Sequence, residues 1–277
     1  MFFVSYWADG ILFSLYILRI FTIPSQKAAP NMQRKRFLHF LSTFLFLLVL
    51  LQGSSCQSQE TLTYKVVEPS LPSSAHPPVL FLLHGFGSNE MDLLSLSKSL
   101  PQNLLVVSVR APFEREGGGY MWCDLQFGGG KFIENLQQAQ QSKEKLITLI
   151  SKINKKYNVD TNNIFLGGFS QGAITSLRTG LTSPQHPFKG IVCLSGRLPY
   201  EINMQQVPQT MKQRTHIFIS HGTMDAVIPI SDGRDIISKL TQNGFHISGK
   251  EYVMQHQITN EVLNDLNAWM KTELLRK

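Results

Sequence analysis

The chain has 277 residues, of which 43% are hydrophobic and 16% are charged, and its formal net charge is +7. This apolar fraction is ordinary for a packed protein and excludes wholesale disorder, while the length fits one or two domains. Three cysteines are too few for a disulfide scaffold, and no apolar run reaches the 18 or more residues that argue for a polytopic membrane protein.

The positive charge is concentrated at the N-terminus. Residues 1–55 hold five basic residues and one acidic residue, which leaves 21 basic and 18 acidic residues, a net charge of +3, for the rest of the chain. That remainder shows no basic patch with interleaved aromatic residues. We therefore expect no nucleic-acid partner.

The N-terminal region has the pattern of an export signal. A basic cluster at residues 34–36 precedes an apolar run at residues 37–51, and Gly53, two serines and Cys56 follow. Such a pattern is typical of a secretory signal. Cysteine after two serines resembles a bacterial lipoprotein signal, although Gly53 stands where such signals usually carry leucine. The sequence thus predicts lipidation of Cys56 and a periplasmic or surface lipoprotein of the bacterial cell envelope. Secretion and an uncleaved membrane anchor are the alternatives.

The first 31 residues fit this signal poorly. Met32 stands directly before the basic cluster, so we expect translation to start there. Residues 61–67 have the composition of an edge strand within a segment rich in Ser, Gln and Pro. The predicted organisation is therefore an upstream extension, a signal peptide, a tether and one folded domain, over residues 1–31, 32–55, 56–78 and 79–277.

Short apolar runs alternate with helical patterns in the body of the chain. The predicted strands cover residues 79–83, 104–109, 164–166, 191–194, 216–220 and 252–256. The predicted helices cover residues 135–157, 171–179, 232–243 and 259–275. This alternation predicts an α/β fold in one domain, with a mostly parallel twisted sheet covered by helices on both faces.

The pentapeptide at residues 168–172, Gly-Phe-Ser-Gln-Gly, fits G-x-S-x-G between a predicted strand and a predicted helix. In that context the pattern is typical of a nucleophile elbow, which exposes the oxygen of Ser170 at a helix N-terminus. A serine that caps a helix in a glycine-rich turn is the alternative. Such a nucleophile needs a base and an orienting acid, which follow it in the order acid, histidine. Asp225 after the strand at 216–220 and His256 before the last helix fit this order.

Two backbone N–H groups are the candidates for an oxyanion hole. One belongs to Gln171, directly after Ser170, and the other to Phe86 in the glycine-containing loop after the first buried strand. His84 begins that loop, and we expect it to hold the loop by hydrogen bonding.

The sequence resembles the phospholipase/carboxylesterase family, which includes acyl-protein thioesterases, over residues 62–275. The motifs that carry the resemblance are His84-Gly85-Phe86-Gly87-Ser88-Asn89-Glu90 with Asp92-Leu93, Gly167-Gly168-Phe169-Ser170-Gln171-Gly172-Ala173, Leu194-Ser195-Gly196, His221-Gly222-Thr223-Met224-Asp225-Ala226-Val227-Ile228-Pro229, and Trp122 after three glycines. The resemblance implies an α/β-hydrolase fold, no cofactor and no metal. It also implies Ser170 as nucleophile, Asp225 as acid and His256 as base.

Departures from the family pattern concern the substrate pocket. Gln255 precedes the candidate base, where the family usually has glycine, and we expect it to narrow the mouth of the site or contact the acyl group. Cys123 follows Trp122 where phenylalanine is usual. Trp122 and Phe127 are candidates for lining an apolar acyl groove, with packing as the alternative role.

The predicted function is a serine hydrolase that cleaves carboxylic esters or thioesters of small or acyl-chain substrates through an acyl-enzyme. Two alternatives remain: a carbohydrate esterase of the feruloyl or acetyl-xylan type, and a non-catalytic, surface-anchored binding protein. The expected partners are a small-molecule ester and a membrane, reached through the lipid anchor or an uncleaved signal. The sequence does not determine the oligomeric state.

Overall fold

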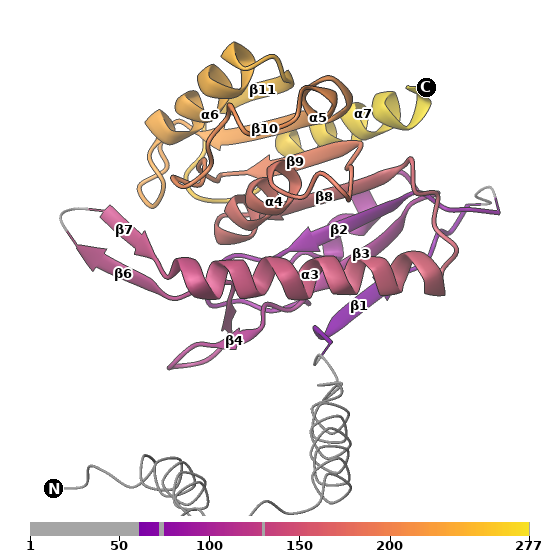
Figure 1. Cartoon of the computed structure of the whole chain (residues 1–277), viewed down its shortest axis with the longest axis horizontal. Coiled ribbons are helices and arrows are strands. Elements are labelled where there is room, and N and C mark those ends of the chain that lie inside the picture. Colours follow the sequence, from indigo (N-terminus) through magenta and orange to yellow (C-terminus); the bar gives the residue numbers. More distant parts are fainter. Residues whose placement is uncertain (1–60, 72–74, 129–130, 277) are drawn as a thin grey trace, which may run out of the picture. The chain divides into compact units, whose positions relative to one another are not determined.

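A seven-stranded sheet forms the centre of the computed structural model, which describes residues 61–71, 75–128 and 131–276 (Figure 1). Its strands, in chain order, are β1 (Tyr64–Val67), β2 (Val79–Leu83), β3 (Leu105–Val109), β8 (Ile164–Phe169), β9 (Gly190–Leu194), β10 (His216–Gly222) and β11 (His246–Tyr252). In space the order is β1-β3-β2-β8-β9-β10-β11. All neighbours are parallel except β1, which is antiparallel to β3 at one edge. The edge strand expected near residues 61–67 is thereby confirmed.

Helices cover both faces of this sheet. They are the 3-10 helix η1 (Leu94–Ser99) and the α-helices α3 (Leu136–Lys156), α4 (Gln171–Leu181), α5 (Gln209–Arg214), α6 (Ile230–Gln242) and α7 (Asn260–Leu275). Alternate residues of β2 separate the two faces. Val79, Phe81 and Leu83 belong to a core with α3, α4 and α6, whereas Leu80 and Leu82 belong to a core with η1 and α7. Successive side chains of a strand point to opposite faces, so the predicted two-sided covering is confirmed.

The last strand differs from its prediction. A strand was expected at residues 252–256, but β11 ends at Tyr252 and pairs with β10 from His216↔His246 to Gly222↔Tyr252. Most side chains of β11 are exposed because it is an edge strand, so it lacks the continuous apolar run that marks the buried strands. His256 lies in the loop that follows.

Two small hairpins stand apart from the central sheet and were not predicted. One pairs β4 (Phe113–Glu114) with β5 (Tyr120–Met121), and the other pairs β6 (Leu125–Gly128) with β7 (Lys131–Glu134). The second hairpin lies beyond the N-terminal end of α3 in Figure 1. Strands this short carry too few residues for an alternating apolar pattern to be recognised.

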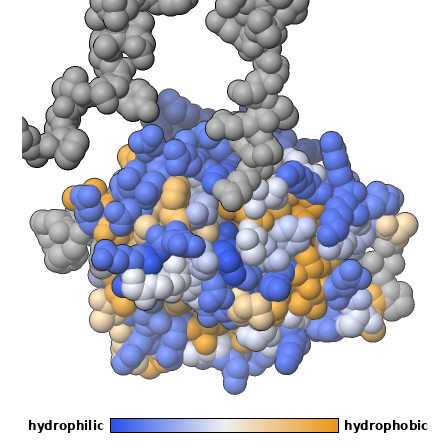
Figure 2. Space-filling model, turned by 90° about the horizontal axis from the view of Figure 1, so that it is seen from below, coloured by the Kyte–Doolittle hydropathy of each residue, from blue (hydrophilic) through white to orange (hydrophobic). Residues whose placement is uncertain are grey.

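The predictions for the first 60 residues, namely the upstream extension, the signal peptide and lipidation of Cys56, lie outside the described residues. Within the described part of the chain, no helix combines the length and apolar character required to cross a membrane. Seen from below, the surface is mainly hydrophilic, with apolar residues in separate patches (Figure 2).

Candidate active site

Three residues far apart in the sequence meet at the carboxyl ends of the parallel strands. Ser170 directly follows β8, while Asp225 and His256 lie in the loops after β10 and β11. His256 Nε2 lies 2.9 Å from Ser170 Oγ, and His256 Nδ1 lies 2.7 Å from Asp225 Oδ2. The imidazole therefore connects the hydroxyl to the carboxylate in one hydrogen-bonded row. This is the place where open α/β sheets position their sites.

The backbone at Ser170 turns sharply between β8 and α4. Ser170 has φ +55° and ψ −120°, a combination that residues other than glycine rarely adopt. The turn is possible because its flanks are glycines. A Cβ on Gly172 would lie 2.0 Å from the carbonyl oxygen of Leu83, and one on Gly168 would lie 2.6 Å from the same oxygen. The predicted elbow is thus a strained turn pressed against the end of β2.

Asp225 is buried, and its carboxylate has three hydrogen-bond partners. Oδ1 accepts hydrogen bonds from the backbone N–H groups of Val227 and Ile228, and Oδ2 faces His256 Nδ1. Because a carboxylate only accepts, Nδ1 of His256 carries the proton. Nε2 is then the acceptor for the Ser170 hydroxyl, which is the orientation that proton transfer from serine requires.

The loop of the predicted oxyanion donor passes close to Ser170. A Cβ on Gly85 would lie 3.5 Å from Ser170 Cβ, which places the Gly85–Phe86 peptide beside the elbow. The Gly87 N–H donates to the Tyr120 carbonyl and so ties the loop to β5. Among the described residues, neither Phe86 N–H nor Gln171 N–H donates to a protein group.

The predicted substrate-contacting residues occupy different environments. Trp122 is completely buried, and its indole N–H donates to the His84 carbonyl, so it presents no open surface to an acyl chain. Its position therefore favours a packing role for Trp122 over lining an acyl groove. Gln255 is exposed next to His256. Phe127 belongs to β6, and its side chain lies outside the description.

Sequence analysis missed the buried polar groups behind the elbow. The Gln171 side chain accepts from the Trp122 N–H at 2.9 Å and donates to the Cys123 carbonyl at 2.7 Å. Nearby, Glu134 Oε2 lies 2.9 Å from Arg178 and 3.0 Å from Arg197. Their individual charges are visible in the sequence, but their pairing depends on contacts between distant elements.

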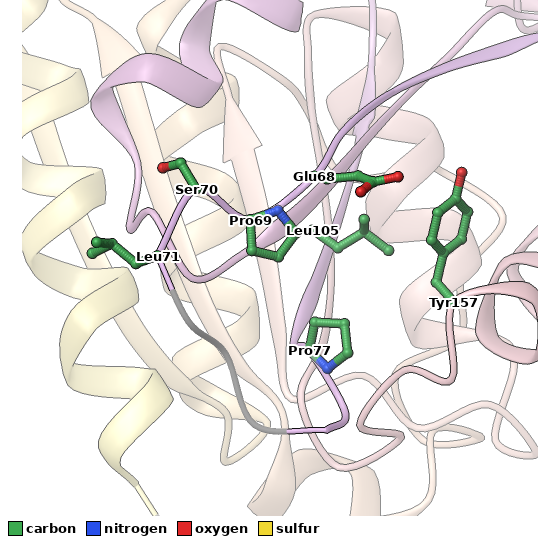
Figure 3. Close-up of a pocket in the computed structure, with 7 residues that line it drawn as sticks. All are labelled: Glu68, Pro69, Ser70, Leu71, Pro77, Leu105 and Tyr157. Atoms are coloured by element: carbon green, nitrogen blue, oxygen red, sulfur yellow. The ribbon is translucent and has the colours of Figure 1, made fainter.

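A pocket of about 420 Å³ lies away from this site. Leu105, the first residue of β3, and Tyr157, at the end of α3, contribute to its lining (Figure 3). β3 and β8 run in the same direction in the sheet. The amino end of β3 and the carboxyl end of β8 therefore lie on opposite sides of the sheet, measured along the strands. The pocket is therefore separate from Ser170. Within the described ranges, no group of three or more His, Cys, Asp or Glu residues is arranged to hold a metal ion.

The chain is similar to acyl-protein thioesterases of yeasts. It is 34% identical over 220 residues to acyl-protein thioesterase 1 of Kluyveromyces lactis, covering 73% of this chain and 95% of that protein. It is also 30% identical over 132 residues to acyl-protein thioesterase 1 of Debaryomyces hansenii, covering 46% of this chain and 56% of that protein. The relatives are thus hydrolases of ester bonds.

These relatives overturn the predicted localisation. Export to a bacterial cell envelope, or secretion, is wrong, because the matching proteins are yeast acyl-protein thioesterases and give no support to a signal peptide or export. The N-terminal pattern misled because it rests on composition: a basic cluster before a run of apolar residues is not specific to exported proteins.

The sequence pattern of the phospholipase/carboxylesterase family matches residues 63–274. Among solved structures, the carboxylesterase of Bacillus cereus superposes with a TM-score of 0.68 at 23% identity, covering 78% of this chain and 97% of that one. This likeness confirms the predicted α/β-hydrolase fold. The chain belongs to the phospholipase/carboxylesterase family of ester-bond hydrolases.

Proposed function

We propose that the chain is a serine hydrolase that cleaves acyl esters or thioesters, with Ser170 as nucleophile, His256 as general base and acid, and Asp225 as the orienting acid. The single observation that carries this proposal is the unbroken row from Ser170 Oγ through His256 to Asp225 Oδ2 at 2.9 and 2.7 Å. The strained backbone of Ser170 supports it, since such strain concentrates at functional sites.

The reaction has two halves. As Ser170 Oγ attacks the carbonyl carbon, its proton passes to His256 Nε2, and the N–H groups of Phe86 and Gln171 stabilise the negative oxygen. The tetrahedral adduct then collapses, the bond to the leaving group breaks, and His256 protonates the departing alkoxide or thiolate. Water, deprotonated by His256, then attacks the acyl-enzyme. The bond from the acyl carbon to Ser170 Oγ breaks, His256 returns the proton to that oxygen, and the carboxylic acid leaves.

The substrate class is argued from the relatives. The Kluyveromyces lactis protein is named an acyl-protein thioesterase, and it matches this chain over 95% of its own length. An acyl thioester is therefore the first substrate to test, with acyl esters beside it. No relative reported above is named a carbohydrate esterase, so the feruloyl or acetyl-xylan alternative is an outcome of the assay.

Replacing Ser170 by alanine tests the nucleophile. We expect Ser170→Ala to lower kcat/KM for a para-nitrophenyl acyl ester by at least about 10⁴-fold, because the members of such a row act as a unit. It should also abolish labelling by a fluorophosphonate probe. Ser176→Ala is the matched control: it removes another α4 hydroxyl, which bonds only the Gly172 carbonyl, and should leave labelling intact.

Unchanged esterase activity in Ser170→Ala would reject this nucleophile. A panel of short-chain and long-chain thioesters, acyl esters, feruloyl esters and acetylated xylan then defines the substrate. We expect turnover of the thioesters and acyl esters. Activity confined to the feruloyl or acetyl-xylan substrates would support the carbohydrate-esterase alternative instead.

A further inference from the structure

The direction of one oxyanion donor is set by a neighbouring carbonyl. Phe86 N–H and Gly85 C=O belong to the same planar peptide, and the described chain contains no cis peptide bond. In a trans peptide the N–H and C=O groups point in opposite directions. Any group that holds the Gly85 carbonyl therefore directs the Phe86 N–H to the opposite side.

His84 holds this carbonyl. Its Nδ1 lies 2.7 Å from Gly85 O, and its Nε2 lies 3.0 Å from the backbone nitrogen of Ala111. Since the Ala111 N–H can only donate, Nε2 is the acceptor, and Nδ1 carries the proton that binds Gly85 O. The ring is completely buried, and burial lowers the pKa of His84, so the neutral form and this tautomer persist at neutral pH.

Trp122 connects His84 to the second donor. Its indole N–H donates to the His84 carbonyl at 2.9 Å, and the two rings are in contact with centroids 5.7 Å apart. Its backbone N–H donates to Gln171 Oε1 at 2.9 Å. A continuous chain of buried hydrogen bonds thus runs from the Gly85 peptide through His84 and Trp122 to Gln171, whose N–H is the other donor.

We propose that His84 and Trp122 form a brace that sets the direction and spacing of the Phe86 and Gln171 N–H groups. The brace rests on the proposed function, because it serves an oxyanion hole. Both members are positioning residues, since neither reaches the reacting atoms. The negative oxygen is absent from the bound substrate and develops only in the transition state and the tetrahedral adduct. Loss of the brace is therefore expected to lower kcat and to leave KM nearly unchanged.

Two variants of His84 separate positioning from packing. His84→Asn places an amide where Nδ1 stands and keeps a donor to Gly85 O, but it loses the Ala111 bond. His84→Gln reaches the place of Nε2 and keeps an acceptor for Ala111, but it loses the Gly85 bond. Each variant loses one buried hydrogen bond, so we expect similar falls in melting temperature.

Only His84→Gln is expected to lose activity strongly. Its kcat should be about 10- to 100-fold lower than that of His84→Asn, because a misdirected oxyanion donor loses part of the stabilisation that a whole donor provides. The KM values of the two variants should agree within about twofold. Equal kcat values for the two folded variants would overturn the brace. Equal kcat values together with an inactive Ser170→Ala would reject the brace but not the proposed function. An active Ser170→Ala in the same assay would reject the proposed function itself.

Trp122→Phe provides an independent test that also serves if a His84 variant does not fold. It keeps an aromatic ring in the core but removes the donor to the His84 carbonyl. We expect kcat to fall about tenfold with KM unchanged, and less than additively when it is combined with His84→Gln, because both act through one chain of bonds. An unchanged kcat in Trp122→Phe would overturn the proposed role of Trp122.

Discussion

Cys123 and Cys193 are free thiols in the described part of the chain, and both are completely buried. Burial raises the pKa of each thiol to about 12, and the carboxylate of Glu134 adds to this effect at Cys123. Only the thiolate is a strong nucleophile. Although Cys123 contacts the Gln171 side chain at 3.4 Å, its chemistry at neutral pH is that of a small packed side chain.

We therefore expect neither of these thiols to react in the native enzyme. Incubation with iodoacetamide at pH 8 should leave Cys123 and Cys193 unmodified, since the thiolate fraction is negligible four units below the pKa of about 12. Unfolding in guanidinium chloride should expose both residues to labelling. Peptide mass spectrometry measures the extent, and fast labelling of native Cys123 would contradict its buried, protonated state.

At the scale of elements, β8, the elbow and α4 work as one unit. The strand enters the turn through two glycines, and a Cβ on Gly167 would lie 2.7 Å from Val192 of β9. Helix α4 then begins against the end of β2, where Gly172 lies against the carbonyl group of Leu83. The close approach of these three backbones places Ser170 Oγ beside His256. The glycines permit this approach because they lack side chains, and Ser170 supplies the reactive hydroxyl.

A methyl group at this contact should be poorly tolerated. Gly172→Ala places Cβ against the Leu83 carbonyl oxygen, which belongs to a central strand and cannot move aside. We expect the free energy of unfolding to fall by about 3 kcal/mol or more. Gly249→Ala on β11 is the control, because its Cβ meets side-chain carbons of Ile237 and Ile247 and no backbone atom. These side chains can shift, so the effect should stay within about 1 kcal/mol. Urea titration measures the free energy of unfolding of both variants. Equal losses in the two would contradict the role of the contact between Gly172 and Leu83.

At the scale of the whole molecule, one buried carboxylate joins three parts of the fold. Glu134 ends β7 and binds Arg178 of α4 together with Arg197, which follows β9. Arg178 also pairs with Glu201 at 2.5 Å. The side chains of Glu134, Arg178 and Arg197 are 2%, 5% and 7% exposed. Removal of Glu134 would therefore leave the buried Arg197 guanidinium without its carboxylate partner, while Arg178 would keep Glu201.

Glu134→Ala should accordingly be strongly destabilising. We expect a loss of about 3–5 kcal/mol in the free energy of unfolding, measured by denaturant titration at pH 7. Glu251→Ala breaks an ion pair with Arg234 whose side chains are 35% and 62% exposed, and it should change stability little because solvent screens the pair. A small effect of Glu134→Ala would show that water reaches the cluster.

Much of the candidate site was predictable from order along the chain. Ser170, Asp225 and His256 were selected because they stand at or just after the ends of predicted strands in the order serine, acid, histidine, and parallel strands bring their carboxyl ends together. The strand predicted at residues 252–256 was misplaced, because β11 is an exposed edge strand without an apolar run. The bond between Trp122 and His84 was not predictable, because it joins residues 38 positions apart through a contact that no local pattern encodes.

The sequence by itself determined the α/β fold and the choice of the three residues, because apolar periodicity and short glycine-flanked motifs are local properties of the chain. The family membership followed from the same motifs. Only the tertiary structure decided that Trp122 is buried against His84 and that Glu134 joins two arginines. Burial and hydrogen-bond partners depend on which distant elements pack together, and that packing arises only when the whole chain folds.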